Sequence, residues 1–380
     1  MSLSEVGERH SVAQQQVQEL RERLRERRAQ LSDIDLVRYS RQYGSKPVRL
    51  NVNEFKCCRT LQGHTGKIYS LDWSYVESTR IVSASQDGRL IVWNAVSSQK
   101  THAIKLACAW VMTAAFSPAG TAVACGGLDN VCSIFHLSSS PDKEGNLPVS
   151  RTLMGHKGYL SCCRYVPDHE AHILTSSGDQ TCILWDAEAN KRIQTFGGDS
   201  PSGHTGDIMS VSISTKDSSL FVSGSCDSTA KLWDTRTPAR ALHTFQGQGG
   251  DVNTVQFLPD GRYFGTGSDD GVCRLFDTRT GHELQHYHDQ HSTSRDPSDV
   301  TSIAFSYSGR LLFAGYTNGN CYVWDTLLAE VITNLGGGMG EGHSSRVSCL
   351  GMASDGSALC TGSWDTSLKV WAYAGNRTIR

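Results

Sequence analysis

The strongest constraint on this chain of 380 residues is one short phrase that it repeats seven times. Each copy ends on an aromatic residue, and six positions earlier it carries an Asp, or an Asn in the sixth copy. The closing aromatics lie at intervals of 42, 50, 48, 43, 48 and 47 residues, at Trp93, Phe135, Trp185, Trp233, Phe276, Trp324 and Trp371. Self-similarity at such a period indicates a repeat architecture in which each copy is one supersecondary unit.

Four copies also contain Gly-His upstream of the Asp, at an offset of 22 or 23 residues. The resulting sets are His64, Asp87 and Trp93; His156, Asp179 and Trp185; His204, Asp227 and Trp233; and His343, Asp365 and Trp371. This pattern resembles the WD-repeat family over about residues 55–375. The resemblance implies an all-β fold, a seven-bladed propeller of four-stranded antiparallel blades. It also implies that His, Asp, Trp and a strand Ser or Thr form a hydrogen-bonded network inside each blade.

Copies two, five and six lack Gly-His, and copy six has Asn318 and Ala314 where others have Asp and Ser or Thr. We therefore expect these three blades to lack the full network. The sequence also predicts how the ring closes. RTLQGH at 59–64 recurs almost unchanged as RTLMGH at 151–156, so the chain enters the propeller on the last strand of a blade. Residues 55–61 should thus complete the seventh blade and leave no free sheet edge.

Repetition of His and Asp argues against catalysis, since a nucleophile and its base normally occur once per site. The stretch LGGGMGEGH (335–343) lacks the G-K-[ST] of a phosphate loop, and HEAH (169–172) is one residue short of H-E-x-x-H. We therefore expect no enzyme activity, no cofactor and no metal site. The net charge of -2 argues against a general nucleic-acid binder.

Aligned copies show a seven-residue strand after each Gly-His loop or its equivalent. Its second position is always aliphatic, whereas two other positions vary widely. Position one is Lys67, Trp110, Tyr159, Asp207, Asp251, Asp299 and Arg346. Position three is Tyr69, Met112, Ser161, Met209, Asn253, Thr301 and Ser348. Strand alternation predicts that both lie on the face opposite position two.

The residue before each turn Asp forms a third set: Gln86, Leu128, Gly178, Cys226, Asp269, Thr317 and Trp364. Antiparallel geometry brings all three sets, which we call the mouth ring, to one end of the central channel. Aromatic and Met side chains among charges are typical of a protein-binding surface. The alternative is that they only plug the channel. On the binding interpretation Trp110 is a surface residue and not part of the core.

Residues 1–42 follow a helical pattern, and 43–54 form a linker. Apolar positions alternate steps of four and three, which predicts a coiled-coil seam at Val17, Leu20, Leu24 and Leu31. A solvated lone helix is the alternative, and its Arg content would also suit RNA or a membrane. The three Glu in QELRERLRERR and the regular seam favour a partner helix.

A coiled-coil helix followed by seven WD repeats resembles the β subunits of heterotrimeric G proteins, and the loops at 137–150, 197–204 and 336–343 suggest the plant branch. The resemblance implies a prenylated, obligate γ subunit bound to the helix. It also implies that the GDP-loaded α subunit, and effectors after its release, bind one propeller face. The matching positions are Lys67, Tyr69, Trp110, Met112, Leu128, Asn130, Tyr159, Asp207, Met209, Asp251, Asn253, Asp269 and Trp364, with Arg89 as a second contact on the blade side.

The expected function is therefore a non-catalytic signal transducer on the cytoplasmic face of the plasma membrane, held there by lipidated partners, and also in the cytosol. An alternative comes from Trp233-Asp234-Thr235-Arg236, because W-D-x-R resembles the box by which some WD proteins dock on cullin-ligase adaptors. A substrate receptor of that kind would not need the N-terminal seam.

Overall fold

The computed structural model describes residues 15, 16, 19, 23, 41, 42, 44, 46 and 48, and then 55–142, 146–198, 200–237, 240–288, 298–335 and 341–373. The chain divides into two units, Met1–Lys46 and Pro47–Arg380. In the first unit residues 15, 16, 19, 23, 41 and 42 are helical, and Arg23 pairs with Glu19 one turn away at 3.3 Å. The predicted seam residues Val17, Leu20, Leu24 and Leu31 lie outside the described residues.

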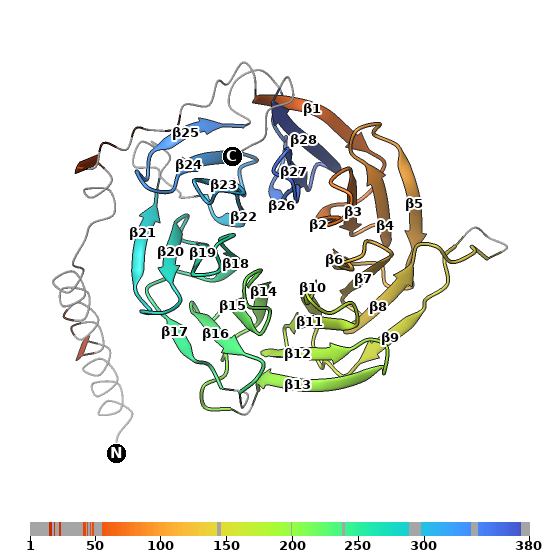
Figure 1. Cartoon of the computed structure of the whole chain (residues 1–380), viewed down its shortest axis with the longest axis horizontal. Helices are drawn as coiled ribbons and strands as arrows, with labels where there is room; N and C mark the ends of the chain where they lie inside the picture. Colours follow the sequence, from red (N-terminus) through yellow and green to blue (C-terminus); the bar gives the residue numbers. More distant parts are fainter. Residues whose placement is uncertain are drawn as a thin grey trace, which may run out of the picture. The chain divides into compact units, whose positions relative to one another are not determined.

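The second unit is a ring of seven four-stranded antiparallel sheets, which confirms the predicted propeller (Figure 1). The innermost strands are β2 (Ile68–Trp73), β6 (Val111–Phe116), β10 (Leu160–Tyr165), β14 (Ile208–Ile213), β18 (Val252–Phe257), β22 (Val300–Phe305) and β26 (Val347–Met352). The second strands are β3 (Arg80–Ser85), β7 (Ala122–Gly127), β11 (His172–Ser177), β15 (Leu220–Ser225), β19 (Tyr263–Ser268), β23 (Leu311–Tyr316) and β27 (Ala358–Ser363).

The third strands are β4 (Arg89–Asn94), β8 (Val131–His136), β12 (Thr181–Asp186), β16 (Ala230–Asp234), β20 (Cys273–Asp277), β24 (Cys321–Asp325) and β28 (Ser367–Tyr373). The outer strands are β5 (Lys100–Lys105), β9 (Arg151–Met154), β13 (Lys191–Gly197), β17 (His243–Phe245), β21 (Glu283–Tyr287), β25 (Val331–Asn334) and β1 (Phe55–Gln62). Blades are numbered one to seven from β2 to β26. The outer strand of blade seven is β1, which pairs antiparallel with β28, so the two ends of the propeller meet in one sheet.

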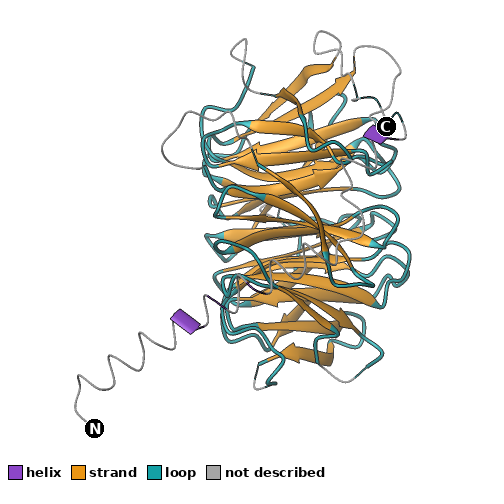
Figure 2. Ribbon diagram, turned by 90° about the vertical axis from the view of Figure 1, so that its left-hand side faces the viewer, coloured by secondary structure: helices purple, strands orange, loops and turns teal. Residues whose placement is uncertain are grey.

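The core lies between neighbouring sheets. One cluster joins Ile68 and Trp93 of blade one to Cys360 and Val370 of blade seven, and six similar clusters fill the other junctions. Because both faces of each sheet are covered, the second and third strands are buried almost throughout, as in HILTSS of β11 and RLIVWN of β4. Figure 2 shows the turns gathered on two opposite faces of the propeller.

The four blades with Gly-His contain a hydrogen-bonded network. In blade four, His204 Nδ1 lies 2.8 Å from Asp227 Oδ2 and Nε2 lies 2.7 Å from Ser223 Oγ, which accepts the Trp233 indole N–H at 2.8 Å. The same contacts, at 2.7 to 3.0 Å, join His64, Asp87, Ser83 and Trp93; His156, Asp179, Thr175 and Trp185; and His343, Asp365, Thr361 and Trp371. The Asp also accepts the loop amide after the His, so each network fixes the loop that leads into the inner strand.

Blade five lacks the histidine but builds a replacement that the sequence did not lead us to expect. Gln248 stands where blades one, three, four and seven have His, and its Nε2 donates to Thr266 Oγ1 at 3.0 Å. Arg274 connects Gln248 to the turn aspartate, because its guanidinium donates to Asp270 Oδ2 at 2.6 Å and to Gln248 Oε1 at 3.0 Å. In blade six Ala314 offers no hydroxyl, and the buried Trp324 Nε1 has no partner among the described residues.

All seven inner strands contain a β-bulge at the same place. In β2 the pairing steps from Ile68–Ser85 to Ser70–Ala84, which leaves Tyr69 as the extra residue. The corresponding bulged residues are Met112, Ser161, Met209, Asn253, Thr301 and Ser348. Plain strand alternation therefore does not hold at position three, because a bulge re-aims its extra residue.

Candidate protein-binding surface

The backbone brings the first and third sets of the mouth ring together in every blade. The residue before each turn Asp or Asn donates its amide to the carbonyl of position one, as Leu128 does to Trp110 at 3.2 Å and Trp364 to Arg346 at 3.0 Å. The other pairs are Gln86–Lys67, Gly178–Tyr159, Cys226–Asp207, Asp269–Asp251 and Thr317–Asp299. Side chains from neighbouring strands thus meet at one rim.

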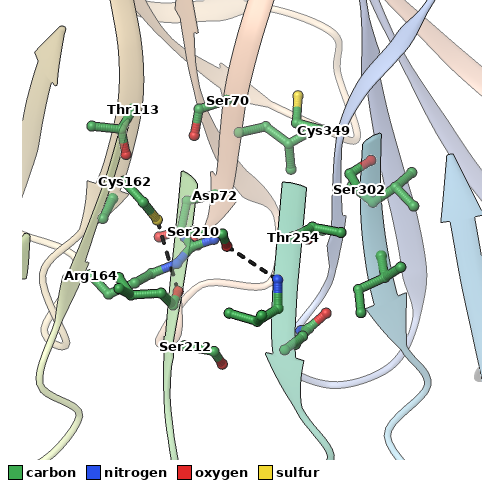
Figure 3. A pocket seen from close by; sticks show the side chains of 18 of the residues that line it. Ser70, Asp72, Thr113, Cys162, Arg164, Ser210, Ser212, Thr254, Ser302 and Cys349 are labelled. Atoms are coloured by element: carbon green, nitrogen blue, oxygen red, sulfur yellow. Dashed lines mark hydrogen bonds and ion pairs between the residues drawn. The ribbon is translucent and has the colours of Figure 1, made fainter. Parts of the chain in front are cut away.

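The bulged residues complete the ring. All seven line the central channel, a cavity of about 260 Å³ that runs between the inner strands. Figure 3 shows side chains that line the channel, among them Ser70, Thr113, Ser210 and Thr254; Ser210 Oγ accepts the backbone N–H of Val255 on the next inner strand at 3.3 Å. Further along the inner strands, the Arg164 guanidinium pairs with the Asp72 carboxylate at 3.2 Å. Burial raises the pKa of that carboxyl, and Arg164 partly offsets the effect.

One arc of the mouth ring is aromatic and cationic. The Tyr69 ring stacks with Trp110 at a centroid distance of 6.4 Å and meets Trp364 edge-on at 6.0 Å. Two cations lie against the Trp364 indole, Lys67 Nζ at 3.9 Å and Arg346 Cζ at 5.0 Å from its centroid. Trp110 is 41% exposed, which confirms the prediction that it is a surface residue. Large, partly exposed aromatics beside Arg or Lys are the side chains most enriched at binding hot spots.

The opposite arc is acidic. Tyr159 donates its hydroxyl to Asp207 Oδ2 at 2.9 Å and lies 3.6 Å from Met209 Sδ. Burial, and then the hydrogen bond to Asp207, raise the pKa of this phenol. Further round, Asn253 Nδ2 donates to Asp269 Oδ1 at 2.5 Å.

Asp251 and Asp299 extend the acidic arc. Burial raises the pKa of the Cys226 thiol to about 12, and the adjacent Asp251 adds to the effect. Burial, together with Asp269, raises the pKa of Asp299, while Arg346 acts in the opposite sense. The mouth ring is therefore electrically divided, with cations on one side and a row of carboxylates on the other.

Two predicted contact residues, Asn130 and Arg89, differ from the rest. Leu128 is 49% exposed and follows the rim, but Asn130 occupies a left-handed turn position with φ of 62°. Gly, Gln, Ser or Thr fills the same turn elsewhere, so backbone conformation alone gives Asn130 a structural role. Arg89 begins β4 on the blade side and does not line the channel. Conversely, Arg346 and Asp299 were in the aligned columns but were not singled out from the sequence.

The W-D-x-R stretch of blade four is accounted for by contacts within the blade. Trp233 is fully buried in the network. The Arg236 guanidinium binds both Asp234 oxygens, at 2.9 and 2.8 Å, and reaches Asp217 at 3.2 Å. Docking of an adaptor at this stretch stays a prediction.

The described residues contain neither a cluster of metal ligands nor a membrane-spanning helix. Within it, His, Cys, Asp and Glu side chains form no group of three or more suited to a metal ion. Among the same residues, no helix has the length and apolar character needed to cross a membrane.

Comparison of the sequence with known proteins identifies a family of WD-repeat proteins that matches nearly the whole chain. Residues 6–372 match the family described as G protein beta WD-40 repeat protein. The chain is 64% identical over 379 residues to guanine nucleotide-binding protein subunit beta-2 of Nicotiana tabacum, with 100% of both chains covered. It is 63% identical over 380 residues to the subunit beta of Arabidopsis thaliana, again with 100% of both covered. The subunit beta of Oryza sativa subsp. japonica is 62% identical over 385 residues, covering 100% of this chain and 99% of the relative.

Proposed function

This chain belongs to the G protein β WD-40 repeat family, and from that membership we propose that it carries signals by exchanging partners at the mouth ring. A GDP-loaded α subunit covers the ring in the resting state. Effector proteins bind the same ring once the α subunit has taken up GTP and left. The chain itself supplies the surface and no chemical step.

The observation that carries this proposal is the Tyr69, Trp110 and Trp364 cluster with its two cations. A soluble propeller does not need three partly exposed aromatics at its channel mouth, because the core lies between the blades. Rigid aromatic rings lose little conformational entropy on binding and bury a large area. The cluster therefore offers anchors for a partner, and the neighbouring charges offer orientation.

Charge division gives the ring a preferred partner orientation. A basic group on the α subunit fits over Asp207, Asp251 and Asp269, while an acidic group fits over Lys67 and Arg346. Complementary charges of this kind act mainly on association rate and register. Effectors that compete for the ring should carry the same arrangement of one basic and one acidic group as the α subunit.

The N-terminal helix provides the second half of the proposal. We expect Val17, Leu20, Leu24 and Leu31 to form a coiled-coil seam with a prenylated γ subunit, without which the chain is poorly soluble. Lipid on the γ and α subunits would hold the assembly at the cytoplasmic face of the plasma membrane, with a further pool in the cytosol.

Partner exchange is tested on the full chain co-expressed with a γ subunit and immobilised. It should retain the α subunit loaded with GDP and release it when a non-hydrolysable GTP analogue is supplied. Proteins retained from native membranes with the analogue should then be displaced by added GDP-loaded α subunit, and Trp110→Ala should weaken both classes. A complex holding the α subunit and such a protein on one β subunit at saturation contradicts the shared surface.

A further inference from the structure

The sixth position of the seven inner strands forms one layer along the central channel. In blade order, its residues are Asp72, Ala115, Arg164, Ser212, Gln256, Ala304 and Gly351. All of them except Ala304 line the cavity of about 260 Å³. Blades two, six and seven have only Ala or Gly here, so little side chain fills their side of the layer. Blades one, three, four and five contribute polar side chains, which face a space that the small residues leave open.

Arg164 faces this space with most of its hydrogen-bond donors unused. Its Nη1 donates to Asp72 Oδ1 at 3.2 Å, and the guanidinium has no second acceptor among the described residues (Figure 3). An arginine carries five N–H donors, so four remain. The Arg164 side chain is 37% exposed although it belongs to an innermost strand, because the channel gives it access to solvent.

Ser212 and Gln256 add further donors. Ser212 Oγ accepts the Phe257 amide at 3.1 Å, which fixes the oxygen and leaves its hydrogen to bond elsewhere. The Gln256 amide group has no hydrogen-bond partner within the described part of the chain. The single carboxylate of the layer, Asp72, already accepts from Arg164 and from the Phe116 amide at 2.8 Å. Unused donors therefore outnumber unused acceptors in this layer.

We propose that this layer binds a small oxyanion, either inorganic phosphate or a phosphate monoester, through Arg164, Ser212 and Gln256. Phosphate oxygens accept several hydrogen bonds at once, and those from a guanidinium are among the strongest that proteins make. Asp72 opposes the anion, but burial raises the pKa of this carboxyl, so uptake of a proton relieves the repulsion.

The site is separate from the mouth ring and does not rest on the proposed function. The same cavity is lined by Tyr69 at the mouth ring and by Tyr75 and Ser354 in the turns at the opposite end. A ligand therefore has a way in that does not cross the surface on which the α subunit and effectors are proposed to bind.

The test is calorimetric titration of the full chain, co-purified with a γ subunit in a chloride buffer. Inorganic phosphate and glycerol 3-phosphate are titrated separately, and the tighter ligand identifies whether the free anion or a monoester is preferred. One saturable site per chain is expected at concentrations up to about 10 mM. Absence of a saturable site for both ligands would mean that only water occupies the channel, and would overturn the proposal.

Gln256→Glu is the most informative variant, because it keeps the shape of the side chain and replaces two donors with a negative charge. It should weaken binding about tenfold or more. Gln62→Glu is the matched control, since it adds the same charge on an exposed position of β1 and should bind as the unaltered chain does. Equal affinity in the unaltered chain and Gln256→Glu would place the anion on the outer surface and overturn the site.

Asp72→Asn should have the opposite effect. It removes the negative charge nearest to Arg164, so phosphate should bind about threefold or more tightly, whereas a purely structural role for Asp72 predicts no gain. Weaker binding would indicate a ligand held by the carboxylate and would overturn the oxyanion assignment. Thermal midpoints establish that each variant is folded. Since none of these measurements uses the α subunit, a negative result leaves the proposed function untouched.

Discussion

The Nζ atom of Lys67 lies 3.9 Å from the centroid of the Trp364 indole, although the two residues belong to blades one and seven. A cation over an indole is attracted by the ring quadrupole, by about 0.5–2 kcal/mol depending on solvent exposure. The contact therefore links blade one to blade seven at the surface, in addition to the core cluster that joins them. It also marks the positive end of a ring whose far side is acidic.

That polarity predicts how a partner approaches. Asp207→Lys and Asp251→Lys should slow association of the GDP-loaded α subunit, and the effect should shrink as salt rises from low to about 0.15 M. Asp260→Lys is the matched control, because this exposed carboxylate lies in the turn between β18 and β19, at the other end of the blade. Rates are read by stopped-flow or surface plasmon resonance. Equal slowing by all three variants would point to net charge instead of the ring.

Trp110 and Val111 are adjacent in sequence and opposite in role. Trp110 is 41% exposed, whereas Val111 is fully buried against blade one. Val111→Ala should lower the free energy of unfolding by about 1–3 kcal/mol and leave binding of the α subunit intact in the folded protein. Trp110→Ala should do the reverse, costing about 2 kcal/mol of binding and little stability. Equal losses in thermal midpoint would make Trp110 a core residue after all.

The blade networks predict a large effect from a single carboxylate. Asp227→Ala removes the carboxylate that lies 2.8 Å from His204 Nδ1 inside blade four and should destabilise the protein by about 1–3 kcal/mol. Asn318→Ala alters the same turn position in blade six, which lacks the histidine, and should cost under about 0.5 kcal/mol. Denaturant unfolding of both variants provides the comparison. Similar losses would mean that the turn, and not the network, carries the energy.

Stability should fall in acid, beginning with His204. Burial lowers the pKa of this imidazole below its ordinary 6.5, and the hydrogen bond to Asp227 only partly offsets that effect. The unfolded chain therefore binds the proton first, so the contribution is complete above about pH 6.5 and is lost as pH falls below it. His204→Gln, which copies the Gln248 of blade five, should show a shallower loss of thermal midpoint between about pH 7 and pH 5.

A second loss should follow at lower pH. Burial alone would raise the pKa of Asp227, but hydrogen bonds from His204, Thr229 and the Thr205 amide hold it below its ordinary 3.8. Asp87, Asp179 and Asp365 share this balance. Their stabilisation is present above about pH 4 and disappears as they are protonated below it. A midpoint that stayed level through both ranges would contradict the assigned shifts.

The coiled-coil prediction rests on the sequence of the N-terminal unit. Leu20→Asp combined with Leu24→Asp should abolish co-purification with a γ subunit, because buried charges at seam positions are strongly disfavoured. Glu19→Gln with Arg23→Gln is the control, since both side chains are exposed and the seam is unchanged. Retention of γ by the double Asp variant would refute the seam.

Sequence reasoning located the propeller and the mouth ring because both follow from registers that repeat seven times. Aligned columns showed which positions the fold leaves free, and Trp110 was placed correctly by that argument alone. The bulge was missed, because its extra residue ranges from Tyr69 to Thr301 and carries no common signature. Nor could the columns show that Gln248 and Arg274 together replace a histidine, since different chemistry supplies the same hydrogen bonds.

The pairing of β1 with β28 sets the order of events during synthesis. Residues 55–62 form the first strand of the propeller to leave the ribosome, yet their partner strand begins at Ser367, which at about 5–20 residues per second is made roughly 15–60 s later. For that interval Phe55 and Leu61, both buried in the finished protein, lack their neighbours on β28, which include Trp371 and Leu368. A nascent chain with an unpaired strand edge is prone to aggregation. The ring can therefore close only after the last strand has been translated, and until then the first strand has no strand to pair with.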